Sequence, residues 1–144
     1  MQDKVLITIR GNRTLDRDSE QLELLIPGKY SRRNGVHTVV YEEPADGDSG
    51  LSGTTINTIR IGKNGMRIIK EGLLNVRMSF LNSSVRTTST YTTPFGDFLV
   101  GIRTNDLSIT DTEDLVAAHV DYRLDVNSEH LSDCVLDVEI RPRA

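Results

Sequence analysis

The sequence predicts an all-β protein, an antiparallel sandwich or barrel of about ten short strands. Three observations lead to this fold class. Apolar residues recur at every second position in most segments, which is the period of a half-buried strand. The breaks between segments carry hairpin dipeptides such as Asn-Gly. Thr, Val and Ile are abundant while Ala occurs only four times, a balance that favours pleated strands over helices.

The predicted strands follow directly from this alternation. In residues 5–9 Val5, Ile7 and Ile9 share a face, and residues 20–26 repeat the pattern with Leu22, Leu24 and Ile26. The clearest case is 118–127, where one face is apolar and the other carries charge. The last strand, 133–141, alternates in the same way and places Cys134 on its apolar face. Cys134 is therefore expected to be a buried core thiol.

Turn residues predict how these strands connect. Asn34-Gly35 and Asn64-Gly65 are expected to form type I′ hairpin turns. In 93–96 Pro and Gly stand at the second and fourth positions of a type I turn, so 85–92 should pair with 97–104. Further breaks are expected at the polar runs 82–83, 105–106, 111–114 and 127–128, and a longer polar loop at 43–53.

Size and charge limit the classes of function. The chain has 144 residues, which suits one domain over 1–144. A net charge of −4 lacks the basic footprint of a nucleic-acid binder. A single cysteine excludes an internal disulfide, and the first residues form no signal peptide or membrane span, so we expect a cytoplasmic protein.

Several short strings resemble functional motifs but lack the rest of the pattern. Residues 47–50 read Gly-Asp-Ser-Gly without the context of a protease triad. Residues 46–48 and 50–54 evoke a calcium loop and a phosphate loop, yet the further ligands are missing. His37, His119 and His130 have no metal-ligand spacing. We therefore expect no catalytic residues, no metal and no cofactor.

The hydroxyl-rich stretch 85–93 is the best clue to a binding site. Neither of its faces is apolar, and a hydroxyl-lined wall inside a barrel would suit a ligand with a polar head and an apolar tail. Four residues are candidate polar contacts for such a ligand: Arg77, Tyr91, Arg103 and Tyr122. The simpler interpretation is that Thr is a good strand former and that the arginines face solvent.

The chain also resembles the YwiB-like family of uncharacterised bacterial proteins, a domain of unknown function. The residues that carry the resemblance run in order along nearly the whole chain: 5-VLITIRG-11, 28-GKY-30, 34-NG-35, 41-YEE-43, 53-GTT-55, 78-MSF-80, 91-YTTPFG-96, Thr104, 122-YRL-124 and Asn127. The resemblance implies a single antiparallel lipocalin-like (calycin) β-barrel, here of about eight to ten strands. It implies no activity, substrate or catalytic residue.

Three functions remain open from the sequence. The first is a non-catalytic barrel that binds a small, partly apolar molecule, with no nucleic-acid or membrane partner. The second is a protein-interaction or structural module, acting as a homodimer or with a protein partner. The third, an enzyme that uses the 43–53 loop as a lid, ranks last because the sequence contains no acid–base pair or nucleophile in a recognisable pattern.

Overall fold

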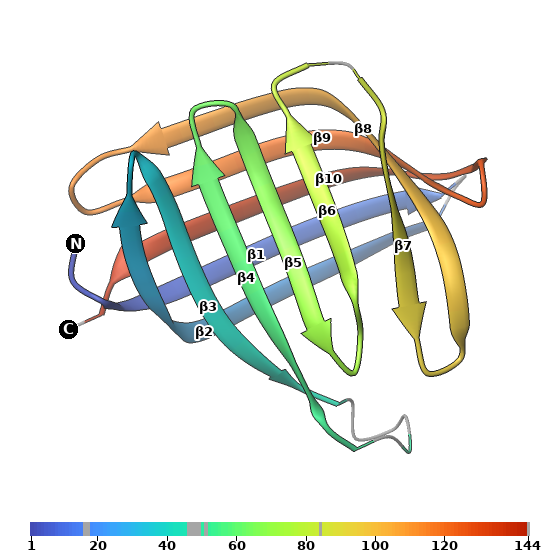
Figure 1. Cartoon of the computed structure of the whole chain (residues 1–144). Coiled ribbons are helices and arrows are strands. Elements are labelled where there is room, and N and C mark those ends of the chain that lie inside the picture. Colours follow the sequence, from blue (N-terminus) through green and yellow to red (C-terminus); the bar gives the residue numbers. More distant parts are fainter. Residues whose placement is uncertain (16–17, 46–49, 51, 84, 144) are drawn as a thin grey trace.

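Ten antiparallel strands form a nearly closed barrel in the computed structural model (Figure 1). The structure describes residues 1–15, 18–45, 50, 52–83 and 85–143. The strands are β1 (Lys4–Leu15), β2 (Asp18–Arg33), β3 (Val36–Pro44), β4 (Thr54–Gly62), β5 (Gly65–Gly72), β6 (Val76–Leu81), β7 (Thr87–Thr93), β8 (Gly96–Asp111), β9 (Val116–Val126) and β10 (Glu129–Pro142). The all-β barrel predicted from the sequence is therefore confirmed. No helix that could cross a membrane occurs in the described part of the chain.

The strands pair with their neighbours in sequence, except that β1 also pairs with β10. The order is β6-β5-β4-β3-β2-β1-β10-β9-β8-β7, so β6 and β7 are the two edges that must meet to close the barrel. They meet through the bridge between Asn75 and Thr92. Two further hydrogen bonds cross this seam, from Thr87 Oγ1 to Ser79 O and from Arg77 N to Ser89 Oγ. Closure thus combines the two backbone hydrogen bonds of the Asn75–Thr92 bridge with two bonds to side-chain hydroxyls, which gives the hydroxyl-rich strand a structural role.

A bend in β2 divides the barrel wall. Residues 18–28 pair with β1 alone, whereas 29–33 pair with β3. The change falls at Pro27-Gly28, where the backbone runs so close to Ile7 that a Cβ on Gly28 would lie 2.6 Å from Ile7 Cδ1. Because β3 does not follow the first half of β2, the wall is open on that side.

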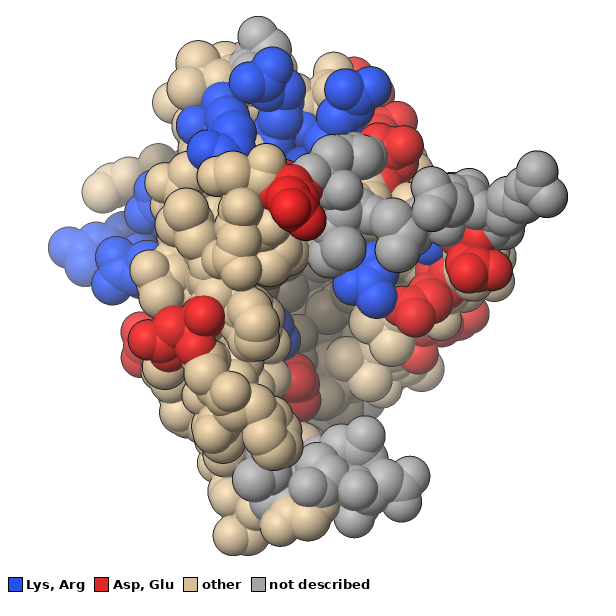
Figure 2. All heavy atoms as spheres, turned by 90° about the vertical axis from the view of Figure 1, so that its right-hand side faces the viewer, with Lys and Arg blue, Asp and Glu red and all other residues tan. Residues whose placement is uncertain are grey.

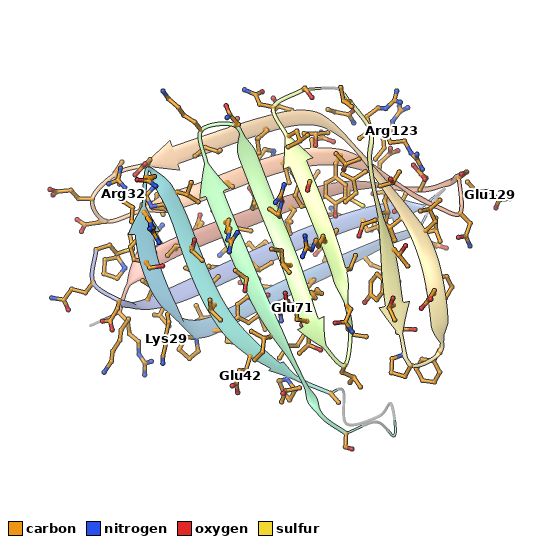
Figure 3. The ribbon with its side chains drawn as sticks, viewed as in Figure 1. Lys29, Arg32, Glu42, Glu71, Arg123 and Glu129 are labelled. Atoms are coloured by element: carbon orange, nitrogen blue, oxygen red, sulfur yellow. The ribbon has the colours of Figure 1, made fainter. Side chains whose placement is uncertain are left out.

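The core fills the barrel interior through every second residue of each strand. Val5 and Ile7 on β1, Val120 on β9 and Val138 on β10 are fully buried, as the alternation predicts. Phe80 packs edge-to-face on Tyr122, with ring centroids 4.8 Å apart. Cys134 is buried in the same core, as predicted. Six charged side chains on the outside, those of Lys29, Arg32, Glu42, Glu71, Arg123 and Glu129, are exposed (Figure 3).

Two of the predicted connections differ in detail. Asn34 and Gly35 both have positive φ and form the expected two-residue turn. At the second Asn-Gly the register pairs Gly62 with Gly65, so the loop is 63–64 and only Gly65 has positive φ. The predicted break at 105–106 is wrong: β8 continues through it, with a β-bulge between Thr104 and Asp106.

The remaining breaks occur where they were predicted. The turn at 93–96 pairs Thr93 with Gly96, and Gly96 has a φ of +137°. Asn127 and Ser128, both with positive φ, connect β9 to β10. The long loop lies between Pro44 and Thr54. The three motif-like strings at 46–54 fall partly or wholly outside the described residues.

Candidate functional site

The candidate site lies at the open end of the barrel, where the β5–β6, β7–β8 and β9–β10 connections lie. Figure 2 views the molecule from this side and shows that the surface is hollowed there. A cavity of about 360 Å³ lies at this end. Its lining residues are Arg13, Val76, Met78, Tyr91, Thr93, Phe98, Val100, Leu124 and Val126. The lining is mostly apolar, as in pockets for small organic molecules.

The strands β6 to β9 hold this lining in place. Tyr91 and Phe98 face each other across the β7–β8 pair. Val100 pairs with Val126 across β8 and β9. At the end of β9, Leu99 N donates to Asn127 Oδ1 at 3.1 Å and Asn127 N donates to Leu99 O at 2.7 Å. These bonds fix the ends of the two strands that carry the apolar wall.

A polar cluster of Glu43, Asn57 and Lys70 lies on the inner face of β3, β4 and β5. Lys70 Nζ donates to Asn57 Oδ1 at 2.8 Å and to Glu43 Oε2 at 3.1 Å. Asn57 Nδ2 donates to the same Glu43 oxygen at 3.4 Å, and Asn57 is fully buried. The ammonium and carboxylate neutralise each other, and the Asn57 amide forms a hydrogen bond with each of them.

The polar cluster borders the apolar cavity. Lys70 stands opposite Val76 across the β5–β6 pair, and Val76 lines the cavity. Burial, and then the charge of Glu43, raise the pKa of Tyr91, which also lines the cavity. The same two causes raise the pKa of Tyr41 to about 12. Both phenols therefore remain protonated at neutral pH and can donate a hydrogen bond.

The four candidate residues that the sequence suggested lie in three different parts of the structure. Tyr91 lines the cavity. Tyr122 is buried in the core against Phe80, and burial raises its pKa. Arg77 and Arg103 are exposed on the outer faces of β6 and β8, because Val76, Val100 and Ile102 take the inward positions beside them. Neither arginine faces the barrel interior, and the idea that they supply its charge has to be corrected.

Sequence reasoning missed the three residues of the polar cluster. They lie on three different strands and contact one another only after β3, β4 and β5 have paired. A signal was present in the alternation: Glu43 follows Val39 and Tyr41 on one face, and Lys70 follows Met66 and Ile68. A charged residue at the next alternate position after a series of inward-facing apolar residues indicates such a buried polar group.

The opposite end of the barrel has its own buried polar chain. Tyr30 OH lies 2.7 Å from His37 Nδ1, and His37 Nε2 lies 2.8 Å from Asp111 Oδ2. His37 is only 2% exposed, so these bonds tie the β2–β3 hairpin to the end of β8. His119 is partly exposed and bonds to Asp137. Among the described residues, no group of three or more His, Cys, Asp or Glu side chains is placed to hold a metal ion.

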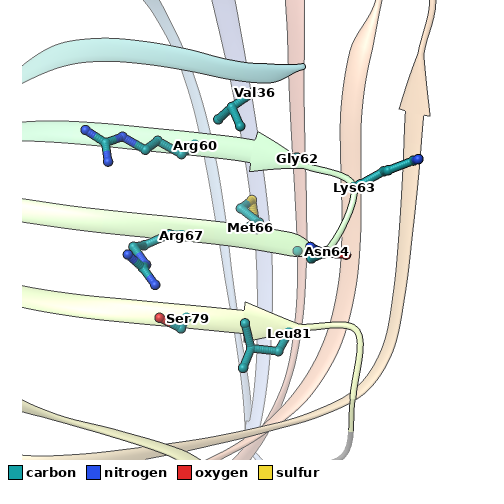
Figure 4. Close-up of a pocket in the computed structure, with 10 residues that line it drawn as sticks. Val36, Arg60, Gly62, Lys63, Asn64, Met66, Arg67, Ser79 and Leu81 are labelled. Carbon is teal, nitrogen blue, oxygen red and sulfur yellow. The ribbon is translucent and has the colours of Figure 1, made fainter. Parts of the chain in front are cut away.

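A second, smaller pocket of about 240 Å³ lies on the outer face of β4, β5 and β6 (Figure 4). Arg60 and Arg67 project from its floor to the same side, while Lys63 points away from them. This pocket is shallow and is separated from the interior by the sheet. We therefore regard the cavity at the open end as the better candidate site.

Comparisons with known proteins agree with this fold. The model of the family "Domain of unknown function (DUF1934)" matches residues 7–138. The crystal structure of the ywiB protein from Bacillus subtilis is similar, with a TM-score of 0.82 and 15% sequence identity, covering 99% of this chain and 93% of that one. No curated protein matches the sequence. Since the family model covers most of the chain, the protein belongs to the DUF1934 family, a YwiB-like domain of unknown function with a barrel fold.

Proposed function

We propose that this barrel binds a small, partly apolar molecule in the cavity at its open end, without chemical turnover. The apolar part of the ligand would contact Val76, Val100 and Val126, and its polar part would reach Lys70 and Tyr91. The observation that carries the proposal is the position of Lys70 directly opposite Val76 across the β5–β6 pair, which places the Glu43–Asn57–Lys70 cluster next to the apolar lining. A cavity of this volume suits a small organic ligand.

The side-chain contacts argue for a binding role in preference to catalysis. Lys70 and Glu43 are held in a mutual ion pair, so neither is poised as a free acid or base. The pKa of Tyr91 is raised and not lowered, so the phenol keeps its proton, is a poor nucleophile and remains available as a hydrogen-bond donor.

A titration with 1-aminoanthracene, an uncharged dye whose fluorescence rises in apolar surroundings, tests the proposal. The wild-type chain should give a saturable increase with one site per chain. Val126→Trp should abolish it, because the indole would fill the cavity that Val126 lines. Val85→Trp is the matched control, since Val85 is 64% exposed and does not line the cavity. Absence of binding by the wild type, or equal binding by both variants, would refute the proposal.

A homodimer is the second candidate. Phe95 at the tip of the β7–β8 hairpin is 77% exposed, and Leu99 is 41% exposed on the same hairpin. Exposed apolar side chains that gather on one hairpin are a common feature of self-association surfaces. Light scattering over a range of concentrations tests this. A dimer that Phe95→Ser converts to a monomer supports it, and a strict monomer excludes it.

The proposed location is the cytoplasm. The single cysteine, Cys134, is buried as a free thiol, which suits a reducing compartment. Fractionation of cells that produce the protein tests the location; recovery in the soluble cell extract supports it, and recovery from the medium contradicts it.

A further inference from the structure

Two ion pairs among the described residues lie in or beside the cavity at the open end. Lys70 is the cation of the polar cluster, and Glu43 neutralises it at 3.1 Å. Arg13 is the charged member of the cavity lining, and it is paired with Glu20. Both pairs are part of the described structure, and together they leave the site with no net charge from these four groups. Among these four described groups, a ligand that carries its own charge would therefore find no unpaired counter-ion.

A charged ligand head would also lose its water. Lys70 is mostly buried, with 19% of its side chain exposed, and Asn57 beside it is fully buried. A carboxylate placed next to Lys70 would also lie next to the Glu43 carboxylate, and an ammonium next to Glu43 would lie next to Lys70. In partly desolvated surroundings, repulsion and lost hydration both oppose binding of either ion.

A neutral head group meets suitable partners instead. Lys70 has three N–H donors, and two of them are directed to Asn57 and Glu43. Tyr91 stands protonated in the cavity lining, whereas the Thr93 hydroxyl, also in the lining, already donates to Gly96 O and accepts from Phe95 N. A hydroxyl or amide on the ligand can accept from the ammonium or phenol without adding charge to the site.

From these contacts we infer that the cavity selects uncharged amphiphiles, such as alcohols or amides of medium chain length, over the fatty acids and alkylamines of equal length. This inference rests on the proposed binding function and specifies its ligand class. The volume of about 360 Å³ corresponds to roughly 12 water-sized groups, which matches a chain of about nine carbons with its head.

The test compares 1-nonanol, nonanoate and nonylamine at pH 7, below their micellar concentrations. Each is measured by displacement of 1-aminoanthracene from the wild-type chain and by direct calorimetry. The three share one alkyl chain and differ only in head-group charge. We expect nonanol to bind at least about tenfold more tightly than either ion, since a desolvated, uncompensated charge costs more than one factor of ten.

Two variants change the balance of charge in opposite directions. Glu43→Gln leaves Lys70 unneutralised and should raise the affinity for nonanoate about tenfold relative to nonanol. Lys70→Met leaves Glu43 alone and should raise the relative affinity for nonylamine instead. Glu42→Gln is the matched control, because Glu42 is the neighbouring residue on the exposed face of β3 (Figure 3). Circular dichroism verifies that each variant is folded.

The outcomes distinguish a failure of this inference from a failure of the proposed binding function. If nonanoate or nonylamine binds the wild type as tightly as nonanol, the inference is wrong while the binding function stands. If none of the three binds at millimolar concentration, the binding function fails and the inference falls with it. If Glu43→Gln and Lys70→Met leave the relative affinities for the three ligands unchanged, the polar cluster does not determine which head group binds. If a variant fails to fold, the comparison of the three ligands on the wild-type chain still decides whether the inference holds.

Discussion

Lys70 and Val76 face each other across the β5–β6 pair, so the ammonium that binds Glu43 borders an apolar wall of the cavity. This juxtaposition arises because β5 ends its inward-facing series with a lysine while β6 begins its own with a valine. A polar and an apolar surface are thereby brought within the reach of one small molecule. The proposed ligand class depends on this relationship.

Two glycines in hairpin turns should differ sharply in their tolerance of a side chain. Gly35 has a φ of +78° with nothing within 4 Å of a Cβ, whereas a Cβ on Gly65 would lie 2.2 Å from the Phe80 carbonyl oxygen. We expect Gly35→Ala to cost about 1 kcal/mol and Gly65→Ala about 3 kcal/mol or more. Urea unfolding measures both. Equal losses would show that the contact with β6 is not tight.

Gly101 should be coupled to the ion pair between Arg86 and Asp125. A Cβ there would lie 2.3 Å from Arg86 Nη2 and 2.5 Å from Asp125 Oδ1, so the guanidinium would have to move. That movement would break a two-bond contact of 2.9 Å and 2.6 Å. We expect Gly101→Ala and Arg86→Met each to lower the melting temperature. The double variant should lose little more than the worse single variant, and additive losses would contradict the coupling.

Stability should fall at alkaline pH in part because of Tyr41. Burial and Glu43 raise its pKa from 10.0 to about 12 in the folded chain. The stability that Tyr41 contributes is fully present below pH 10. It is lost as the pH rises through about 12, because the unfolded chain releases the phenolic proton at a lower pH than the folded chain does. The difference between a pKa of 10.0 and one of about 12 corresponds to about 3 kcal/mol of stability. Urea unfolding from pH 8 to about 12 should give a shallower decline for Tyr41→Phe than for the wild type; parallel curves would contradict this.

The outer face of β4 and β5 carries an unfavourable charge pair. Arg60 stands directly opposite Arg67, and both are exposed. Since like charges in this position repel, Arg60→Glu should raise the free energy of unfolding by about 0.5 kcal/mol at low salt. The gain should vanish at about 1 M salt, where such pairs are screened. Arg60→Gln should fall between the two. A gain that persists at high salt would point to a cause other than charge.

Much of the fold could be predicted because burial on one side of a strand leaves a strict period of two. Val120 and Val138 are fully buried at the positions that the alternation assigns. The details that failed depend on register. Asn64-Gly65 resembles Asn34-Gly35 in sequence, but its strands pair one residue earlier, which moves the asparagine to the second loop position. At Asn105 a single extra residue is absorbed as a bulge, which polar composition alone cannot distinguish from a break.

The site was harder to predict than the fold because its parts come from distant segments. Glu43 and Lys70 are 27 positions apart and contact each other only through the pairing of β3, β4 and β5. The outward direction of Arg77 and Arg103, by contrast, was available from the sequence. Each lies next to inward-facing apolar residues, so the alternation that located the core already assigned both arginines to the outer face.

The most direct test of the binding site is the set of nuclear Overhauser effects between bound 1-nonanol and the methyl groups of the protein. Methyls on Val76, Val100, Leu124 and Val126 should contact the alkyl chain, because all four residues line the cavity at the open end. Val36, on the outer pocket, should show none. Contacts confined to Val36 or other exposed methyls, or no contacts at saturating ligand, would contradict the account.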